Sequence, residues 1–141
     1  MTIDALSPQD ALVAVMVAVS AVDQNMTDSE LASISAIIDI LPVFHNYDRD
    51  RTGTVANMVA DLFEEEDGLD ALLGLVEHAL PDHLRETAYA LGCDVAAADK
   101  RVNMYELRFL EMLRDDLRVG RLAAAAIERG ARARHQLLTA R

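Results

Sequence analysis

One stretch of the chain, Leu84 to Leu117, has the pattern of two amphipathic helices joined by a short polar turn. Apolar residues recur along its first half in steps of three and four, which is the spacing of one helix face. Asp99 lies in the turn, and Asn103 is followed three residues later by Glu106, the pattern of a capping box that starts a new helix. The stretch therefore predicts a helix–turn–helix unit.

A copy of this unit lies upstream, between residues 12 and 41. Asp23 falls on Asp99 and Glu30 falls on Glu106, both at an offset of 76 residues. The capping pattern and the apolar stripe of the second helix recur at the same offset. Two copies are too few for a solenoid, which needs at least three repeats. We therefore expect a closed domain in which the two units are related by a pseudo-twofold axis.

The rest of the chain adds helix signals and shows no alternating strand pattern, so the predicted fold class is all-α. The three prolines fall where helices are expected to begin or end. Seven helices are expected, at about residues 8–22, 28–40, 54–65, 68–79, 81–98, 104–117 and 122–138. At 141 residues the chain suits one compact domain, 1–141, with repeat halves at about 8–41 and 84–117 and a C-terminal helix at about 122–138.

Composition predicts a sizeable core made of aliphatic rather than aromatic side chains. Hydrophobic residues make up 52% of the chain, whereas aromatic residues make up 4% and Trp is absent. Cys93 is the only cysteine, so no intrachain disulfide forms, and a small buried side chain is the favoured interpretation. The N-terminus lacks a basic signal-peptide region, and the longest apolar run, Ala11–Val22, is about half the length of a membrane span. We expect a cytoplasmic protein that is not an integral membrane protein.

The net charge of −11 is distributed unevenly. Residues 1–99 carry 19 acidic and 3 basic side chains, whereas residues 100–141 carry 5 acidic and 10 basic ones. The acidic bulk argues against nucleic-acid binding, which needs a basic surface. The favoured interpretation is that the arginine-bearing C-terminal helix lies against an acidic face of the same molecule. The alternative is that this basic end meets an anionic membrane, a partner or an oxyanion.

The two acidic turns form the candidate binding site. If the units are related by a pseudo-twofold axis, Asp23, Glu30, Asp99 and Glu106 come close together, and Asp94 lies one helical turn before the second of the two turns. Carboxylate oxygens are the ligands that Ca²⁺ and Mg²⁺ prefer, so the pattern predicts a site for Ca²⁺ or another divalent cation. The competing interpretation is structural, because the glutamates also fit capping boxes and the aspartates fit ordinary turns.

Other motifs are weaker. The segment from Asp48 to Gly53 resembles the start of an EF-hand loop, but Val59 stands where the loop needs its bidentate glutamate, so a chance match is favoured. The acidic run Glu64–Asp67 is expected to be a solvated helix junction. No zinc spacing, nucleophile–base pattern or phosphate-binding loop occurs, so no catalytic residue is predicted and the chain is expected not to be an enzyme.

The chain resembles a known family in three segments: VSAVDQNMTDSELASI, CDVAAADKRVNMYELRFLEMLRDDL and LAAAAIERGARARH. These are similar to the TerB-like family associated with tellurite resistance. The resemblance covers most of the chain and is weakest from Arg49 to Leu80. The family often has Gly where this chain has Lys100, which leaves the acidic pair intact but puts a left-handed turn in doubt.

The resemblance implies a compact all-helical domain with a role in the response to toxic oxyanions or related stress, and it implies no catalytic activity. It also implies an acidic cation site. The first hypothesis is therefore a TerB-like stress-response domain that binds a divalent cation through its paired acidic turns. The alternative is a metal-free interaction module whose protein partners include a membrane-associated complex.

Overall fold

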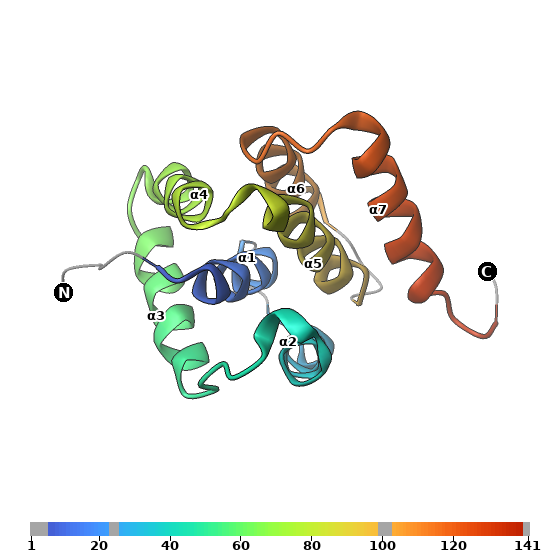
Figure 1. Ribbon diagram of the computed structural model, residues 1–141, viewed down its shortest axis with the longest axis horizontal. Helices are drawn as coiled ribbons and strands as arrows, with labels where there is room; N and C mark the ends of the chain where they lie inside the picture. Colours follow the sequence, from blue (N-terminus) through green and yellow to red (C-terminus); the bar gives the residue numbers. More distant parts are fainter. Residues whose placement is uncertain (1–5, 23–25, 99–102, 140–141) are drawn as a thin grey trace.

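The computed structural model describes residues 6–22, 26–98 and 103–139, and it confirms the all-α fold class. Seven α-helices and two short 3-10 helices follow one another, and the described residues contain no strand. In chain order these are α1 (Pro8–Ala21), α2 (Asp28–Ile40), η1 (Pro42–Phe44), α3 (Arg51–Phe63), α4 (Gly68–Ala79), η2 (Asp82–Leu84), α5 (Arg85–Ala98), α6 (Met104–Asp116) and α7 (Arg121–Arg134). Figure 1 shows their arrangement.

Capping boxes start the second helix of each predicted unit. The backbone N–H of Glu30 donates to the Thr27 hydroxyl at 3.1 Å at the start of α2, and the N–H of Glu106 donates to the Asn103 side chain at 2.9 Å at the start of α6. The glutamate of each box accepts in return from the backbone N–H of its cap residue. These contacts satisfy N–H groups that the first helical turn leaves unpaired. The predicted starts of both helices are confirmed.

Two helices form the centre of the molecule. α1 is surrounded by α2, α3, α4, α5 and α6, and 11 of its 14 residues are buried. α5 packs on α1, α2, α6 and α7. α1 was the only long apolar run in the sequence, and the structure buries that run inside the helical core. No helix among the described residues is long and apolar enough to cross a membrane.

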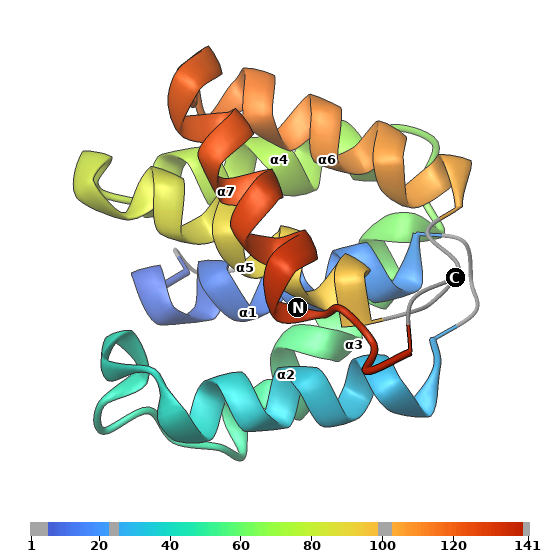
Figure 2. The ribbon, with the colours of Figure 1, turned by 90° about the vertical axis from the view of Figure 1, so that its right-hand side faces the viewer.

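The two helix pairs, α1–α2 and α5–α6, pack across each other. α2 contacts α5 as well as α1, and α6 contacts α1 as well as α5. Figure 2 shows that α1 and α5 end on the same side of the molecule, where α2 and α6 begin. The turns that join these helices lie outside the described residues, so the pseudo-twofold relation of the two units stays a prediction.

Different helices cover the two central ones. α3 and α4 pack together and onto α1, whereas α7 packs on α5. The corner between α3 and α4 is tight: a Cβ atom placed on Gly68 would lie 1.6 Å from the carbonyl oxygen of Leu62. Only glycine permits this approach of two backbone segments. α3 and α4 therefore form a closed hairpin over α1, while α7 is a single helix on α5.

Three predicted boundaries were wrong. α3 begins at Arg51, not near Thr54, because the Arg51 side chain is held by Asp10 of α1 and fixes the first turn. α5 begins at Arg85, after the 3-10 turn η2, not near Pro81. α7 ends at Arg134, before the predicted end at Leu138.

Candidate functional site

The candidate cation site lies at the shared end of the two helix pairs. Of its five predicted ligands, Glu30, Asp94 and Glu106 are described, whereas Asp23 and Asp99 lie outside the described residues. Among the described residues, no group of three or more His, Cys, Asp or Glu side chains is placed to hold a metal ion. The predicted set depends on the two aspartates, so it stays a prediction.

Glu30 has one bonded and one unbonded carboxylate oxygen. Its Oε1 accepts from the backbone N–H of Thr27 at 2.9 Å and from the Thr27 hydroxyl at 3.0 Å. Its Oε2 is fully buried and accepts no hydrogen bond from the described residues, and Glu30 is 1% exposed. A buried charged oxygen without a hydrogen bond is costly, and in native proteins it indicates a bound water or ion. Beyond its capping role, Glu30 therefore has one buried oxygen that is available to a water or an ion.

Glu106 occupies the corresponding place in the second unit. It is also 1% exposed, and its Oε1 lies 3.5 Å from the backbone nitrogen of Asn103. Both glutamates sit in the first turn of a helix, where the positive end of the helix dipole favours a negative charge. Sequence reasoning predicted their capping role but gave no signal for their burial, which comes from the crossed packing of the helix pairs.

The structure places Asp94 apart from this pair of glutamates, on the side of α5 that meets α7. Its Oδ1 accepts from Arg134 at 2.7 and 3.2 Å, and the His135 ring lies 3.5 Å away. A cation at Asp94 would have to displace this guanidinium. The sequence showed the aspartate but not its partner, because the two residues lie 40 positions apart.

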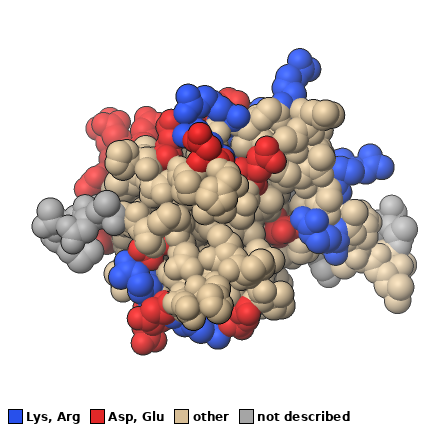
Figure 3. Space-filling model, viewed as in Figure 1, with Lys and Arg blue, Asp and Glu red and all other residues tan. Residues whose placement is uncertain are grey.

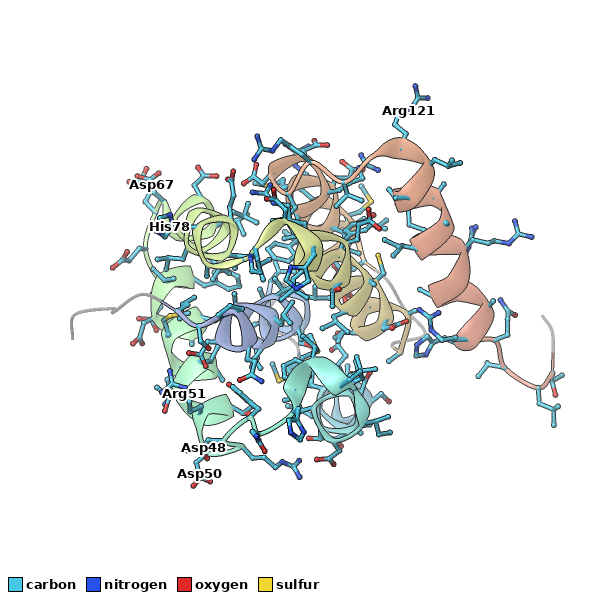
Figure 4. The ribbon with its side chains drawn as sticks, viewed as in Figure 1. Asp48, Asp50, Arg51, Asp67, His78 and Arg121 are labelled. Atoms are coloured by element: carbon cyan, nitrogen blue, oxygen red, sulfur yellow. The ribbon has the colours of Figure 1, made fainter. Side chains whose placement is uncertain are left out.

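The weaker acidic motifs have structural roles or lie exposed. Asp48 accepts from the backbone N–H of Asp50 at 3.0 Å, a turn that leads into α3 (Figure 4). Arg49 of this EF-hand-like loop pairs with Asp39, and Arg51 pairs with Asp10. The acidic run at residues 64–67 is exposed at the α3–α4 corner, as predicted.

The basic C-terminal region pairs only in part with the acidic bulk. Six described arginines lie within ion-pair distance of a carboxylate, and Arg134 is the one on α7. No described carboxylate pairs with the other four, all on α6 or α7: Arg108, Arg121, Arg129 and Arg132. Figure 3 shows acidic side chains gathered over α3 and α4 and basic ones along the α7 side, and Figure 4 shows Arg121 pointing away from the helices.

A hydrogen bond and an ion pair that meet at Glu128, under α7, were not predicted. The Tyr89 hydroxyl donates to Glu128 Oε2 at 2.6 Å, and Arg114 lies 3.9 Å from the same oxygen. Burial is the main cause that raises the pKa of the Cys93 thiol, to about 12, so the thiol is protonated at neutral pH. This supports the prediction that Cys93 is a small buried side chain rather than a reactive one.

These features define a class: an all-helical domain made of two helix–turn–helix pairs, with a buried acid in the first turn of each second helix. The family model described as "Tellurite resistance protein TerB" matches residues 9–129. The chain therefore belongs to the TerB family, as its sequence resemblance predicted. No curated protein and no solved structure matches it significantly.

Proposed function

We propose that this chain is a non-enzymatic TerB domain of the tellurite and stress response that holds a divalent cation between its two acidic turns. Glu30 and Glu106 are the proposed ligands from the described residues, and Asp23 and Asp99 are the proposed ligands from the turns themselves. The observation that carries the proposal is the buried Oε2 of Glu30, which accepts no hydrogen bond from the described residues. A cation at this oxygen would neutralise the buried charge.

The ligand chemistry favours hard cations. All four proposed donors are carboxylates, and such oxygen ligands suit Ca²⁺, Mg²⁺ and Mn²⁺. Zn²⁺ sites in proteins use mainly His and Cys, and the only cysteine lies under α7 with a protonated thiol. The cation would join the starts of α2 and α6, so its expected effect is to stabilise the contact between the two units rather than to activate a substrate.

Titration of chelator-treated protein with Ca²⁺, Mg²⁺, Mn²⁺ and Zn²⁺ by calorimetry, with melting temperature measured alongside, tests this proposal. Saturable binding should raise stability by about 2.7 kcal/mol at a free ion concentration a hundred times the Kd. The variant Glu30→Gln/Glu106→Gln keeps both capping boxes, since Gln also completes them, but removes both charges. It should lose the response.

The matched control is Glu64→Gln/Glu65→Gln, which removes two exposed charges from the α3–α4 corner and should respond as the wild type does. Asp99→Asn should also weaken cation binding relative to the wild type if the second turn supplies a ligand. No binding at millimolar ion, or full binding by the double glutamate variant, would contradict the cation site and leave the glutamates as caps.

The second candidate is a metal-free interaction module that docks onto a membrane-associated complex. The four unpaired arginines on α6 and α7 favour it, because such side chains are available to an anionic surface. Chelator-treated protein should then co-sediment with anionic vesicles or pull down protein partners, and added cations should not change its melting temperature. Cation binding that is lost in Glu30→Gln/Glu106→Gln would favour the first candidate.

A further inference from the structure

A pocket opens between α5, α6 and α7. Figure 2 shows that α7 starts beside the end of α6 and then diverges from it as it crosses α5. The wedge left between the two helices is a pocket of about 350 Å³. This volume lies within the usual range for small-molecule sites, which are mostly apolar with a few placed polar groups.

Small side chains keep this pocket open. Its lining includes Ala96 and Ala97 from α5 and Ala131 from α7, whose methyl groups do not fill the wedge. Leu107 and Leu110 of α6 form the opposite wall of the pocket. Leu107 is 46% exposed, because its apolar side chain borders this open space. The lining therefore offers uncovered apolar surface to a ligand.

The polar groups at one end of the pocket already bind one another. Glu128 accepts from the Tyr89 hydroxyl and lies beside Arg114, as described above. The Cys93 thiol is protonated and adds no charge to the lining. Because these groups already bind one another, we expect a ligand's charged group to lie at the mouth of the pocket.

Two charged side chains at the mouth are not joined to each other by an ion pair: Arg132 on α7 and Glu111 on α6. Arg129 and Arg108 lie on the same two helices and also lack a described carboxylate partner. The charged side chains of the pocket lining balance, two arginines against two glutamates, but Arg132 has no described carboxylate partner and is available to an anionic ligand group.

We propose that this pocket binds a medium-chain carboxylate, with the acyl chain on the alanine-lined floor and the carboxylate at Arg132. The pocket follows α5 from Tyr89 to Ala97, which is about 12 Å of helix at 1.5 Å per residue. This length matches an extended medium-chain acyl group. The guanidinium of an arginine can hold a carboxylate through two parallel hydrogen bonds.

Calorimetric titration with sodium decanoate in chelator tests the proposal separately from the cation site. We expect saturable binding at one site, with affinity falling about fourfold for each CH₂ removed in octanoate and hexanoate. Decanol should bind more weakly than decanoate. The absence of saturable decanoate binding, or equal binding of decanol, would overturn the proposal.

Charge variants locate the carboxylate. Arg132→Gln should weaken decanoate binding about two- to fivefold, as expected for an exposed ion pair. Arg129→Gln removes the same charge from the same helix outside the pocket and should change affinity less. Glu111→Gln removes a like charge from the mouth and should strengthen binding. Equal effects of the two arginine substitutions would overturn the placement at Arg132.

A filling variant locates the acyl chain. Ala97→Leu places a larger side chain on the pocket floor and should abolish binding, whereas Ala133→Leu on the exposed face of α7 should leave binding unchanged. Circular dichroism and melting temperature check that both variants fold. Unchanged decanoate binding by folded Ala97→Leu would overturn the site, and if that variant fails to fold, the arginine pair still decides the outcome.

Discussion

Each central helix is tied to a covering helix by one aspartate–arginine pair, but the two pairs lie in different surroundings. Asp10 of α1 uses both carboxylate oxygens to accept from Arg51 of α3, at 2.9 and 2.7 Å, and its side chain is 3% exposed. Asp94 of α5 uses one oxygen to accept from Arg134 of α7, and its side chain is 19% exposed. The aspartate of the first link is buried and accepts with both oxygens, whereas the aspartate of the second is partly open to water; both arginines are about half exposed.

The two covering helices also differ in the size of the side chains that they bury in the core. α3 contributes four sizeable buried side chains to the core: Val55, Met58, Val59 and Leu62. α7 contributes two buried alanines. Apolar burial therefore holds α3 on α1, while α7 depends more on its polar links to α5. The two halves share their local helix signals but are closed by different forces, and α7 is the helix expected to open first.

The largest effect is expected at the corner that closes the first half. Gly68→Ala places a Cβ atom against the Leu62 carbonyl, so the two backbone segments must move apart. We expect a loss of more than about 3 kcal/mol in the free energy of unfolding, measured by urea denaturation. Gly74→Ala, on the same helix but with open space around it, should gain about 0.5–1 kcal/mol. A neutral Gly68→Ala would mean that the α3–α4 hairpin does not hold the core closed.

Removing each aspartate compares the two links directly. Asp10→Ala also removes the partner of the N-cap Ser7 and should cost about 2–3 kcal/mol of unfolding free energy. Asp94→Ala should cost about 1 kcal/mol or less, since its ion pair is partly solvated. Chemical denaturation of both variants and of the wild type measures the difference. Equal costs would show that burial of the link does not distinguish the halves.

The contribution of the Asp10–Arg51 ion pair to stability should be lost at acidic pH. Burial alone would raise the pKa of Asp10, but hydrogen bonds from Arg51 and Ser7 outweigh it and hold the pKa below its usual 3.8. The folded state therefore keeps this carboxylate charged at a pH where the unfolded state binds a proton. Its contribution is complete above about pH 4 and is lost as the pH falls through the lowered pKa. The melting temperature of Asp10→Asn should consequently fall less than that of the wild type between pH 5 and pH 3.

A carboxylate of α6 provides a control with the opposite sign. Burial, followed by the nearby charges of Glu77, Asp70 and Asp115, raises the pKa of Asp116. Its contribution to stability is present at low pH and is lost as the pH rises through the raised pKa. Asp116→Asn should therefore gain in melting temperature relative to the wild type as the pH rises from 3 to 7. The same trend in both variants would contradict the assignment of these shifts.

Sequence patterns predicted the elements whose ends carry local signals. The starts of α2 and α6 were predicted correctly because Thr27 and Asn103 are followed by glutamates that complete a capping box within three residues. The start of α3 was missed because Arg51 is fixed by a residue of α1, and a contact 41 positions away leaves no local pattern. The early end of α7 has a similar origin, since Arg134 and His135 both contact Asp94.

The candidate site, too, could be predicted only as far as local sequence signals reach. The acidic residues and their pairing at one offset could be found in the sequence, but Asp23 and Asp99 lie outside the described residues, so the site they would form stays a prediction. The burial of Glu30 could not be found there, because it depends on how α2 packs against α5 as well as α1. The pocket under α7 was missed too, since small residues such as Ala97 predict close packing and not a hollow.

The smallest expected effect distinguishes the opening of α7 alone from unfolding of the whole domain. The Tyr47 hydroxyl donates to Asp10 at 3.2 Å in the first half, and the Tyr89 hydroxyl donates to Glu128 at 2.6 Å in the second. Each Tyr→Phe substitution removes one hydrogen bond worth about 1 kcal/mol. Tyr89→Phe should speed hydrogen exchange in both α7 and the core, because its hydrogen bond is broken whether α7 opens alone or the whole domain unfolds. If α7 opens before the core, Tyr47→Phe should speed exchange in the core but leave exchange in α7 unchanged, because the Tyr47–Asp10 bond stays intact while α7 alone is open. Faster exchange in α7 as well as in the core of Tyr47→Phe would show that both halves open together.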